Sequence, residues 1–211
     1  SVLIFDLSDN GLVRVYPMIK VLSRRYRVEV IGVVFGDEIY NPYQNEFQFK
    51  VISINKKRNR FTAYLLMMKD LIKSIEGDVI YAFKPKLFSF GVGLLAKIYY
   101  KIPLVLDIED LETVNWIGKS FASRVRLVFG RLDFQNEFFN YVMERFVPLA
   151  DDKIVVSKYL QDKFGGTRIV HGADVNVFNP MNFNKQEVRS KLELKHDDKY
   201  ILFSGMPREH K

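Results

Sequence analysis

Residues 78–112 read DVIYAFKPKLFSFGVGLLAKIYYKIPLVLDIEDLE, and this stretch decides the fold. Two apolar runs, 78–83 and 102–110, enclose a segment with apolar side chains at helical spacing: Phe88, Val92, Leu95, Ala96 and Tyr99. Strands without polar alternation are typical of parallel sheets buried on both faces, and parallel neighbours need a crossover helix. The stretch therefore predicts a strand–helix–strand unit of an α/β protein.

The same alternation continues in both directions along the chain. Further strands are predicted at 2–6, 28–36, 49–55, 152–157 and 167–171, and further helices at 10–25, 61–75 and 120–147. Pro17 predicts that the first helix starts near Val15 or kinks, and the last stretch predicts one long helix or a broken pair. We expect a Rossmann-like, doubly wound and mostly parallel sheet with helices on both faces, which binds ligands at the carboxyl ends of its strands.

Composition narrows the class of protein. The 211 residues are 48% hydrophobic and 14% aromatic, enough for a large core, and they include no cysteine, which excludes disulfides, thiolate metal sites and a cysteine nucleophile. The net charge of +7 suits phosphorylated small molecules, nucleic acid or an anionic membrane surface, or is merely a basic surface. No signal peptide is evident, and Lys97, Lys101 and Pro103 interrupt the longest apolar run.

The end of the chain has a different character. We expect the first domain to span 1–180 and a polar, turn-rich linker with one short helix to reach 199. Residues 200–211, YILFSGMPREHK, predict a strand (200–204) and a basic turn, a pattern typical of phosphate-binding loops. They would open a second domain.

Acidic side chains gather where the strand at 102–110 ends. Asp107 and Glu109 share a face if the strand continues, and Asp110 starts the loop. Such carboxylates can bind a metal ion, accept hydrogen bonds from sugar hydroxyls or act as a base. The alternative is structural, with Asp110 capping a helix and Glu112 in its first turn.

Other motifs are weaker. Gly11 in DNGLVR would let the backbone approach an anion, with Arg14 adding charge, but an ordinary capped turn fits equally. Gly91-x-Gly93-x-x-Ala96 resembles a dinucleotide fingerprint, but it lies inside a helix, where close packing against the sheet explains it better. His171 ends the strand at 167–171, and so few histidines argue against a histidine metal cluster.

Two basic stretches contain aromatic residues. The run KKRNR at 56–60 precedes Phe61, and residues 119–134 mix arginines with phenylalanines. Such surfaces can sit on an anionic membrane or grip nucleic acid, and a solvated face over a core stripe is the plain alternative.

Three stretches together resemble the family 4 glycosyltransferases, a retaining two-domain class with the GT-B fold. The stretch 78–112 is similar to the family's strand–helix–strand with its acidic or histidine-bearing loop. The passage at 150–180, ADDKIVVSKYLQDKFGGTRIVHGADVNVFNP, is the most specific, with His171-Gly172-Ala173-Asp174 in place of Asn-Gly-Val-Asp. The end, ILFSGMPREHK, is similar to the opening of the nucleotide-sugar domain.

The resemblance implies a hexosyltransferase-type enzyme that moves a sugar from a nucleotide sugar to a glycan or lipid-linked acceptor with retention. This chain would be the acceptor-side domain, inactive alone. It implies donor binding by Gly11, Arg208 and Lys211, catalytic positions at Glu109 and Asp110, and acceptor or sugar binding by Asp107, Lys84 and His171. The family often has a histidine at the position of Glu109, and its arginine usually follows the glycine directly, where Met206 stands here.

The resemblance implies no metal or cofactor and no nucleic-acid partner. It implies a cytoplasmic location, with an anionic membrane face as a candidate partner. Two alternatives remain: a nucleotide-dependent oxidoreductase that uses residues 90–96, and a non-catalytic module that docks on a membrane through residues 119–134.

Overall fold

The computed structural model describes the chain apart from residues 9–11, 36–37, 41–46, 54–59, 114–115, 117, 130–135, 171, 173–174, 176–178, 196 and 203–211. The chain divides into two compact units, Ser1–Gly172 and Ala173–Lys211. The predicted linker at 181–199 and the second domain from 200 stay predictions.

The first unit is built on one parallel sheet in the order β3-β2-β1-β4-β5-β6-β7. Its strands are β1 Val2–Ile4, β2 Val30–Val34, β3 Phe49–Ser53, β4 Ile80–Phe83, β5 Leu104–Ile108, β6 Asp152–Val155 and β7 Thr167–Arg168. Each strand lies within a range that the sequence predicts, and every pair of neighbours is parallel. The Rossmann-like fold class is therefore confirmed.

Helices connect these strands. They are α1 Leu12–Leu22, α2 Arg60–Lys73, the π-helix η2 Leu87–Gly91 running into α3 Val92–Tyr100, α5 Phe121–Phe129, α6 Glu137–Phe146, the 3-10 turn η3 Val147–Leu149 and α7 Lys158–Phe164. The stretch 120–147 thus forms two helices, and Asn136 caps the second by accepting hydrogen bonds from the amides of Phe138 and Phe139. Helix α1 begins at Leu12 and contains Pro17, so a start near Val15 is wrong, and the alternative of a kink at Pro17 stays a prediction.

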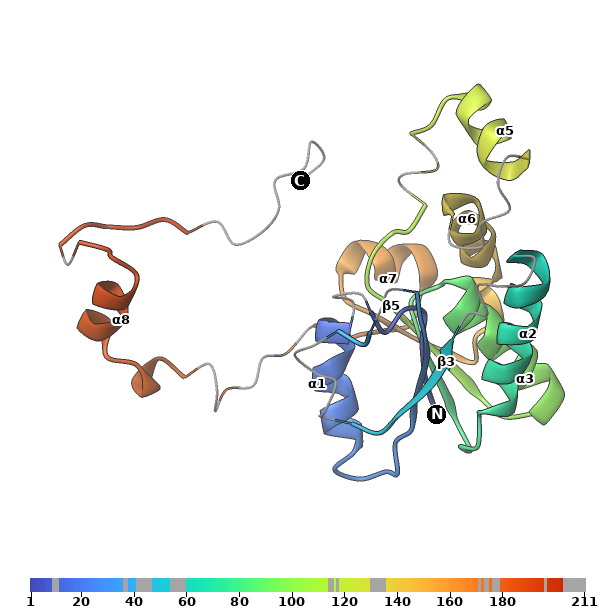
Figure 1. Cartoon of the computed structure of the whole chain (residues 1–211), viewed down its shortest axis with the longest axis horizontal. Helices are drawn as coiled ribbons and strands as arrows, with labels where there is room; N and C mark the ends of the chain where they lie inside the picture. Colours follow the sequence, from blue (N-terminus) through green and yellow to red (C-terminus); the bar gives the residue numbers. More distant parts are fainter. Residues whose placement is uncertain are drawn as a thin grey trace. The chain divides into compact units, whose positions relative to one another are not determined.

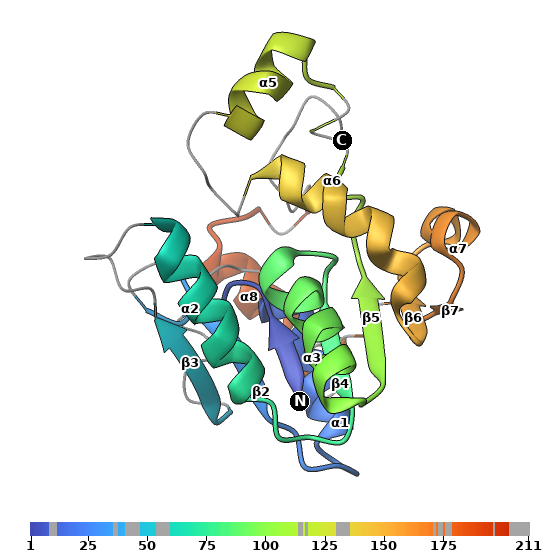
Figure 2. The same cartoon turned by 90° about the vertical axis from the view of Figure 1, so that its right-hand side faces the viewer.

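The sheet is buried on both faces, as Figures 1 and 2 show, with α1 on one side and α2 and α3 on the other. Alternate residues of the same strands enter different cores. The core under α1 holds Leu12, Val15 and Ile19 against Val2, Ile4, Val30, Tyr81 and Phe83. The opposite core holds Met67, Leu71, Phe88 and Ala96 against Leu3, Ile31, Ile80, Leu104 and Leu106. This double burial explains why the strands lack polar alternation.

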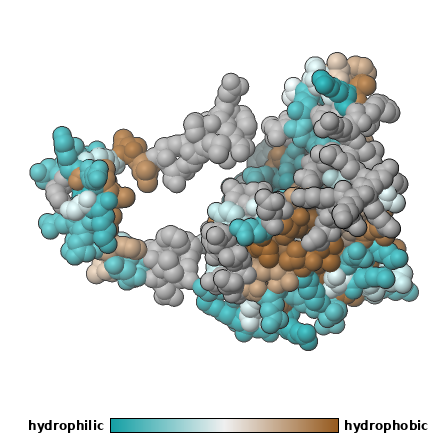
Figure 3. Space-filling view, viewed as in Figure 1, coloured by the Kyte–Doolittle hydropathy of each residue, from teal (hydrophilic) through white to brown (hydrophobic). Residues whose placement is uncertain are grey.

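None of the residues that the structure describes in the second unit is buried. It contains the 3-10 turn η4 Pro180–Asn182 and the short helix α8 Lys185–Lys191, in neither of which is any residue buried. Figure 3 shows α8 covered mainly by hydrophilic side chains, whereas apolar side chains gather on the first unit between α1 and α2. No strand is assigned at Tyr200–Leu202, and residues 203–204 lie outside the described part, so the strand at 200–204 stays a prediction.

Candidate functional site

The order of the strands places a switch point between β1 and β4, because the chain winds outward from these two central strands in opposite directions. Ligands of open α/β sheets bind at such points, outside the carboxyl ends of the strands. Arg14 on α1 follows β1, Lys84 follows β4 and Glu109 follows β5. Tertiary folding brings these three side chains together.

Lys84 turns the chain sharply where β4 ends. Its φ of 68° lies in the left-handed region, which is costly for a residue with a side chain. Its amide donates to the carbonyl of Asp107 at 2.9 Å, and its own carbonyl accepts from the amide of Lys86 and the hydroxyl of Ser89, both at 2.8 Å. Pro85 is the centre of this tight turn, for which its fixed φ is suited. The backbone conformation of Lys84 is therefore held by three hydrogen bonds.

The ammonium group of Lys84 faces three carboxylates. Its Nζ lies 3.4 Å from Oε2 of Glu109, 3.3 Å from Oδ2 of Asp110 and 3.5 Å from Oε1 of Glu112. Lys86 Nζ adds a second cation, 3.6 Å from Oε2 of Glu112. The cluster is therefore an ion-pair network, which limits the freedom of each side chain.

Glu109 is the most enclosed member, with 1% of its side chain exposed. It forms an ion pair with Arg14, whose side chain is 47% exposed, as well as with Lys84. A buried carboxylate needs such compensation, because desolvation opposes its charge. Asp110 differs, since 56% of its side chain is exposed. One carboxylate of the cluster is thus sealed and another is open to a ligand.

Asp107 lies deeper, within β5. It accepts a hydrogen bond from the hydroxyl of Tyr81, and both residues are buried. Burial, and next the negative charge of Asp107, raise the pKa of Tyr81 far above its usual value of 10. Tyr81 belongs to the core beneath α1, and Arg14 lies on α1, so Asp107 and Glu109 face the same side of the sheet. Strand periodicity predicted this shared face.

Of the residues predicted from the sequence, the structure brings Lys84, Glu109 and Asp110 together, with Asp107 behind them. Gly11, His171, Arg208 and Lys211 lie outside the described residues. Sequence reasoning missed Lys86 and Tyr81. A tyrosine in a buried strand beside one that carries an aspartate is a signal that could have revealed Tyr81, because a buried hydroxyl needs a partner.

Glycine at 93 serves packing. A Cβ added there would stand 2.8 Å from Cδ1 of Leu104 and 3.4 Å from Cγ2 of Ile80, both on the sheet. Close approach of α3 to the sheet is therefore what requires Gly93, as the sequence indicated. This removes the motif on which the oxidoreductase alternative depended.

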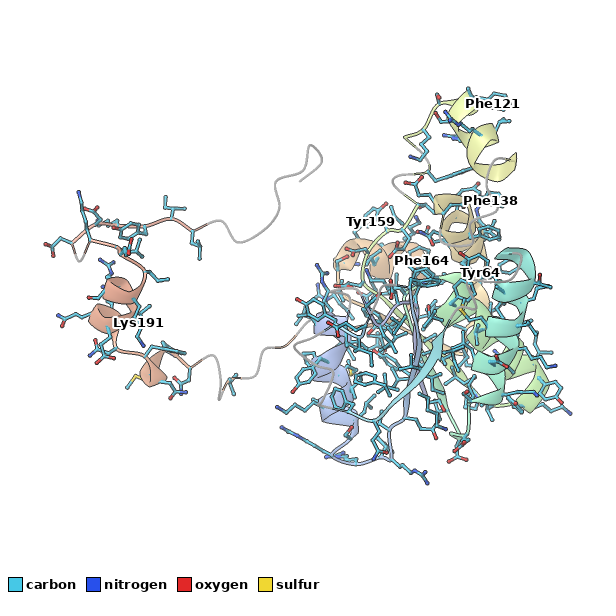
Figure 4. All side chains as sticks on the ribbon, viewed as in Figure 1. Tyr64, Phe121, Phe138, Tyr159, Phe164 and Lys191 are labelled. Carbon is cyan, nitrogen blue, oxygen red and sulfur yellow. The ribbon has the colours of Figure 1, made fainter. Side chains whose placement is uncertain are left out.

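The basic and aromatic stretch is partly described. Figure 4 shows Phe121 near the start of α5, and 82% of this residue is exposed. Val125 is also exposed, and the guanidinium of Arg124 lies 5.8 Å from the centre of the Trp116 ring. Residues 56–59 and 130–135 lie outside the described residues. Among the described helices, none has the length and apolar character to cross a bilayer.

No grouping of three metal-ligating side chains exists among the residues that the structure describes. The expectation that no metal takes part stays a prediction.

The parallel sheet and its switch point define a Rossmann-like α/β protein, and the solved structures that resemble it have the GT-B fold. HepE from Anabaena, in complex with UDP and glucose, is 16% identical, with a TM-score of 0.57 over 90% of this chain and 49% of that one. The complex of HepE with UDP-glucose has the same identity and TM-score, over 91% of this chain. A putative UDP-N-acetylglucosamine 2-epimerase from Listeria monocytogenes is 12% identical, with a TM-score of 0.51 over 77% and 40%.

At these identities the likeness concerns the fold alone. The chain spans about half the length of HepE, and it spans less than half the length of the epimerase. No family model matches the sequence, and no curated protein matches it either.

Proposed function

We propose that this chain is the acceptor-side half of a retaining glycosyltransferase of family 4, which moves a hexose-type sugar from a nucleotide sugar to a glycan or lipid-linked acceptor. The observation that carries the proposal is the meeting of Arg14, Lys84 and Glu109 at the switch point of the sheet. HepE, which shares the fold, is solved with UDP and glucose and with UDP-glucose, and this supports a nucleotide-sugar donor.

The two proposed catalytic carboxylates have different access to a substrate. Asp110 is open to solvent, and its Oδ2 lies 3.3 Å from Nζ of Lys84, so it can accept hydrogen bonds from sugar hydroxyls. Glu109 is sealed by Arg14, so it reaches a sugar only when Arg14 moves aside. While its ion pair with Arg14 is intact, Glu109 orients the side chains of Arg14 and Lys84.

Transfer from a nucleotide sugar needs stabilisation of the negative charge that develops on the leaving diphosphate. We propose that Arg208 and Lys211 supply cationic donors and that Gly11 lets the backbone approach the phosphates. Arg14 would lie near by, since it follows Gly11 by less than one helical turn. This chemistry needs no metal ion.

Asp107 and His171 complete the proposed sugar-binding set, with Lys84. The carboxylate of Asp107 is held by Tyr81 beneath the network. The backbone carbonyl of Asp107 accepts a hydrogen bond from the amide of Lys84 at 2.9 Å. We therefore expect Asp107 to affect sugar binding by positioning Lys84 more than through its own side chain.

The test is release of nucleoside diphosphate from UDP-, GDP- and ADP-sugars in the presence of candidate acceptors. It is run with the 211-residue chain and with a version that continues into a donor-binding half. Release by the longer version alone is expected. Turnover by the 211-residue chain at ordinary enzyme rates, of about 1 s⁻¹ or more, would overturn the assignment to the acceptor side.

Two variants test the site itself. In the active version, Lys84→Met and Asp110→Asn should each lower kcat/KM at least about tenfold, because displaced or missing polar groups misalign the reacting atoms. Lys50→Met is the matched control. Lys50 also bridges carboxylates, at 3.3 Å to Glu29 and 2.9 Å to Glu76, but it stands near the amino end of β3. Equal losses in all three variants would argue against the site.

We further propose a cytoplasmic enzyme that rests on an anionic membrane face through α5. The exposed Phe121 and Val125 would enter the interface, with Arg124 and Arg126 near the lipid phosphates. The chain should float with vesicles that contain phosphatidylglycerol and not with purely zwitterionic ones, and Phe121→Ser should weaken the binding. Binding that ignores lipid charge, salt and Phe121 would exclude this partner.

A further inference from the structure

A buried carboxylate outside the ion-pair network holds the chain just after it. Glu144, on α6, has 6% of its side chain exposed. Its Oε1 accepts from the amide of Thr113 at 2.9 Å, and its Oε2 accepts from the hydroxyl of Thr113, also at 2.9 Å. Lys163 on α7 lies 3.5 Å from the same Oε2. Thr113 is itself buried, so this paired contact is shielded from water.

Two more contacts continue along the same helix. The ring of Trp116 lies 5.5 Å from that of Phe138 and 5.8 Å from that of Tyr141, between ring centres. Nζ of Lys119 lies 3.0 Å from Oε2 of Glu137. The partners on α6 at positions 137, 141 and 144 follow the spacing i, i+4, i+7, which places them on one stripe of a helix. The described residues from Thr113 to Lys119 therefore contact α6 in order from its end towards its start, so the two segments run in opposite directions.

This arrangement fixes both ends of the acidic segment. Residues 109–112, which carry Glu109, Asp110 and Glu112, are held by β5 on one side and by Thr113 on the other. Asp110 is three residues from Thr113, a reach of about 10 Å at most, so the position of Thr113 limits where the carboxylates beside Lys84 can lie. A buried carboxylate is a poor way to improve packing alone, because desolvation opposes it. The two hydrogen bonds that Glu144 accepts from Thr113 suit a role in placing this segment.

We propose that Glu144 is a positioning residue: through Thr113 it sets the place of Asp110 and Glu112 beside Lys84. Its consequence for catalysis depends on the proposed transferase function, whereas its effect on the segment does not. Glu144 itself touches no substrate in this proposal.

The experiment compares Glu144→Ala with Glu144→Gln. Hydrogen exchange of the Thr113 amide is measured by NMR on the 211-residue chain, with the amide of Ile80 as the global reference, since it donates to Pro103 within the core. In Glu144→Ala, exchange at Thr113 should become at least about tenfold faster while Ile80 keeps its rate. The ¹⁵N order parameters of residues 109–112 should fall below about 0.6. Glu144→Gln should stay near wild type, because its amide can still pair with Thr113.

Lys163→Met is the matched control, since it removes the other partner of Glu144 and leaves both bonds to Thr113. Exchange at Thr113 should stay within about threefold of wild type. If Glu144→Ala does not fold, the same measurements are made on Thr113→Val. This variant removes only the hydrogen bond from the Thr113 hydroxyl, so a smaller effect is expected.

In the version with a donor-binding half, Glu144→Ala should lower kcat about tenfold to a hundredfold with the donor KM within about twofold, and Glu144→Gln should restore kcat. The proposal is overturned if exchange at the Thr113 amide rises only as much as exchange at the Ile80 amide, or if the order parameters of residues 109–112 do not change. It is also overturned if these order parameters fall while kcat stays at the wild-type value. Absence of transfer in the wild type would refute the proposed function, and the NMR results would still decide whether Glu144 positions the segment.

Discussion

The contact between Tyr81 and Asp107 allows a quantitative prediction. Tyr81→Phe removes a hydroxyl that donates to a buried carboxylate, and Phe fills nearly the same volume. A hydrogen bond to a charged group contributes about 1.5–3 kcal/mol, so the free energy of unfolding at pH 8 should fall by about 2 kcal/mol. The magnitude rests on the loss of one bond, because the substitution creates no large cavity.

The same substitution should change the response to alkaline pH. The pKa of Tyr81 is raised in the folded protein, so the unfolded chain loses this proton first, above pH 10. The stability linked to Tyr81 is therefore complete below pH 10 and declines as the pH rises beyond it. By pH 11 the wild type should lose about 1.4 kcal/mol that Tyr81→Phe does not lose, and the gap between them should narrow from about 2 to below 1 kcal/mol.

Urea unfolding followed by circular dichroism between pH 8 and 11 measures this gap. Asp107→Asn is the informative companion, because burial is the first cause of the raised pKa of Tyr81 and remains when the charge is removed. Asp107→Asn should thus keep most of the alkaline decline that Tyr81→Phe abolishes. A gap that stays constant from pH 8 to 11 would refute the argument that Tyr81 stays protonated in the fold.

Three further predictions concern the framework. The hydrogen bond from Lys97, followed by that from the amide of Leu104, lowers the pKa of Asp151. Because 44% of the Asp151 side chain is exposed, solvent screens these contacts, and Asp151→Ala should cost about 0.5 kcal/mol at pH 7. That cost should fade in acid unfolding curves as the pH falls below about 4, and a constant cost would contradict it. Gly93→Val should lower the free energy of unfolding, measured in urea, by about 1–3 kcal/mol, and it should not change the affinity for a nicotinamide cofactor. An unchanged free energy of unfolding would show that α3 can move away from Leu104. Asn136→Ala should cost about 1 kcal/mol through loss of the cap of α6, whereas Asn136→Gly should cost only a few tenths, and equal costs would argue against capping.

Much of the fold could be predicted from the sequence, because strands and helices depend on local patterns of apolar residues. Apolar runs without alternation indicate buried parallel strands, and all seven described strands lie where these runs are. Boundaries were less predictable. Helix α1 runs from Leu12 through Pro17, and the break between α5 and α6 could not be chosen over one long helix, because helical spacing alone continues through both.

The site divides in the same way. The acidic end of β5 and the glycine-rich helix near it were visible in the sequence, since strand ends and helix spacing are local properties. The pairing of cations with carboxylates was not visible in the sequence, because Arg14 and Glu109 are separated by 95 positions in the chain.

The sequence by itself thus determined the parallel α/β sheet and the edge at which its polar groups collect. Only the tertiary structure decided that Lys84 would face three carboxylates, that Arg14 would seal Glu109 and that Glu144 would hold Thr113. The physical reason is that periodicity reports which face of an element is buried. Pairing between charged groups depends on strand order and register, which long-range packing sets.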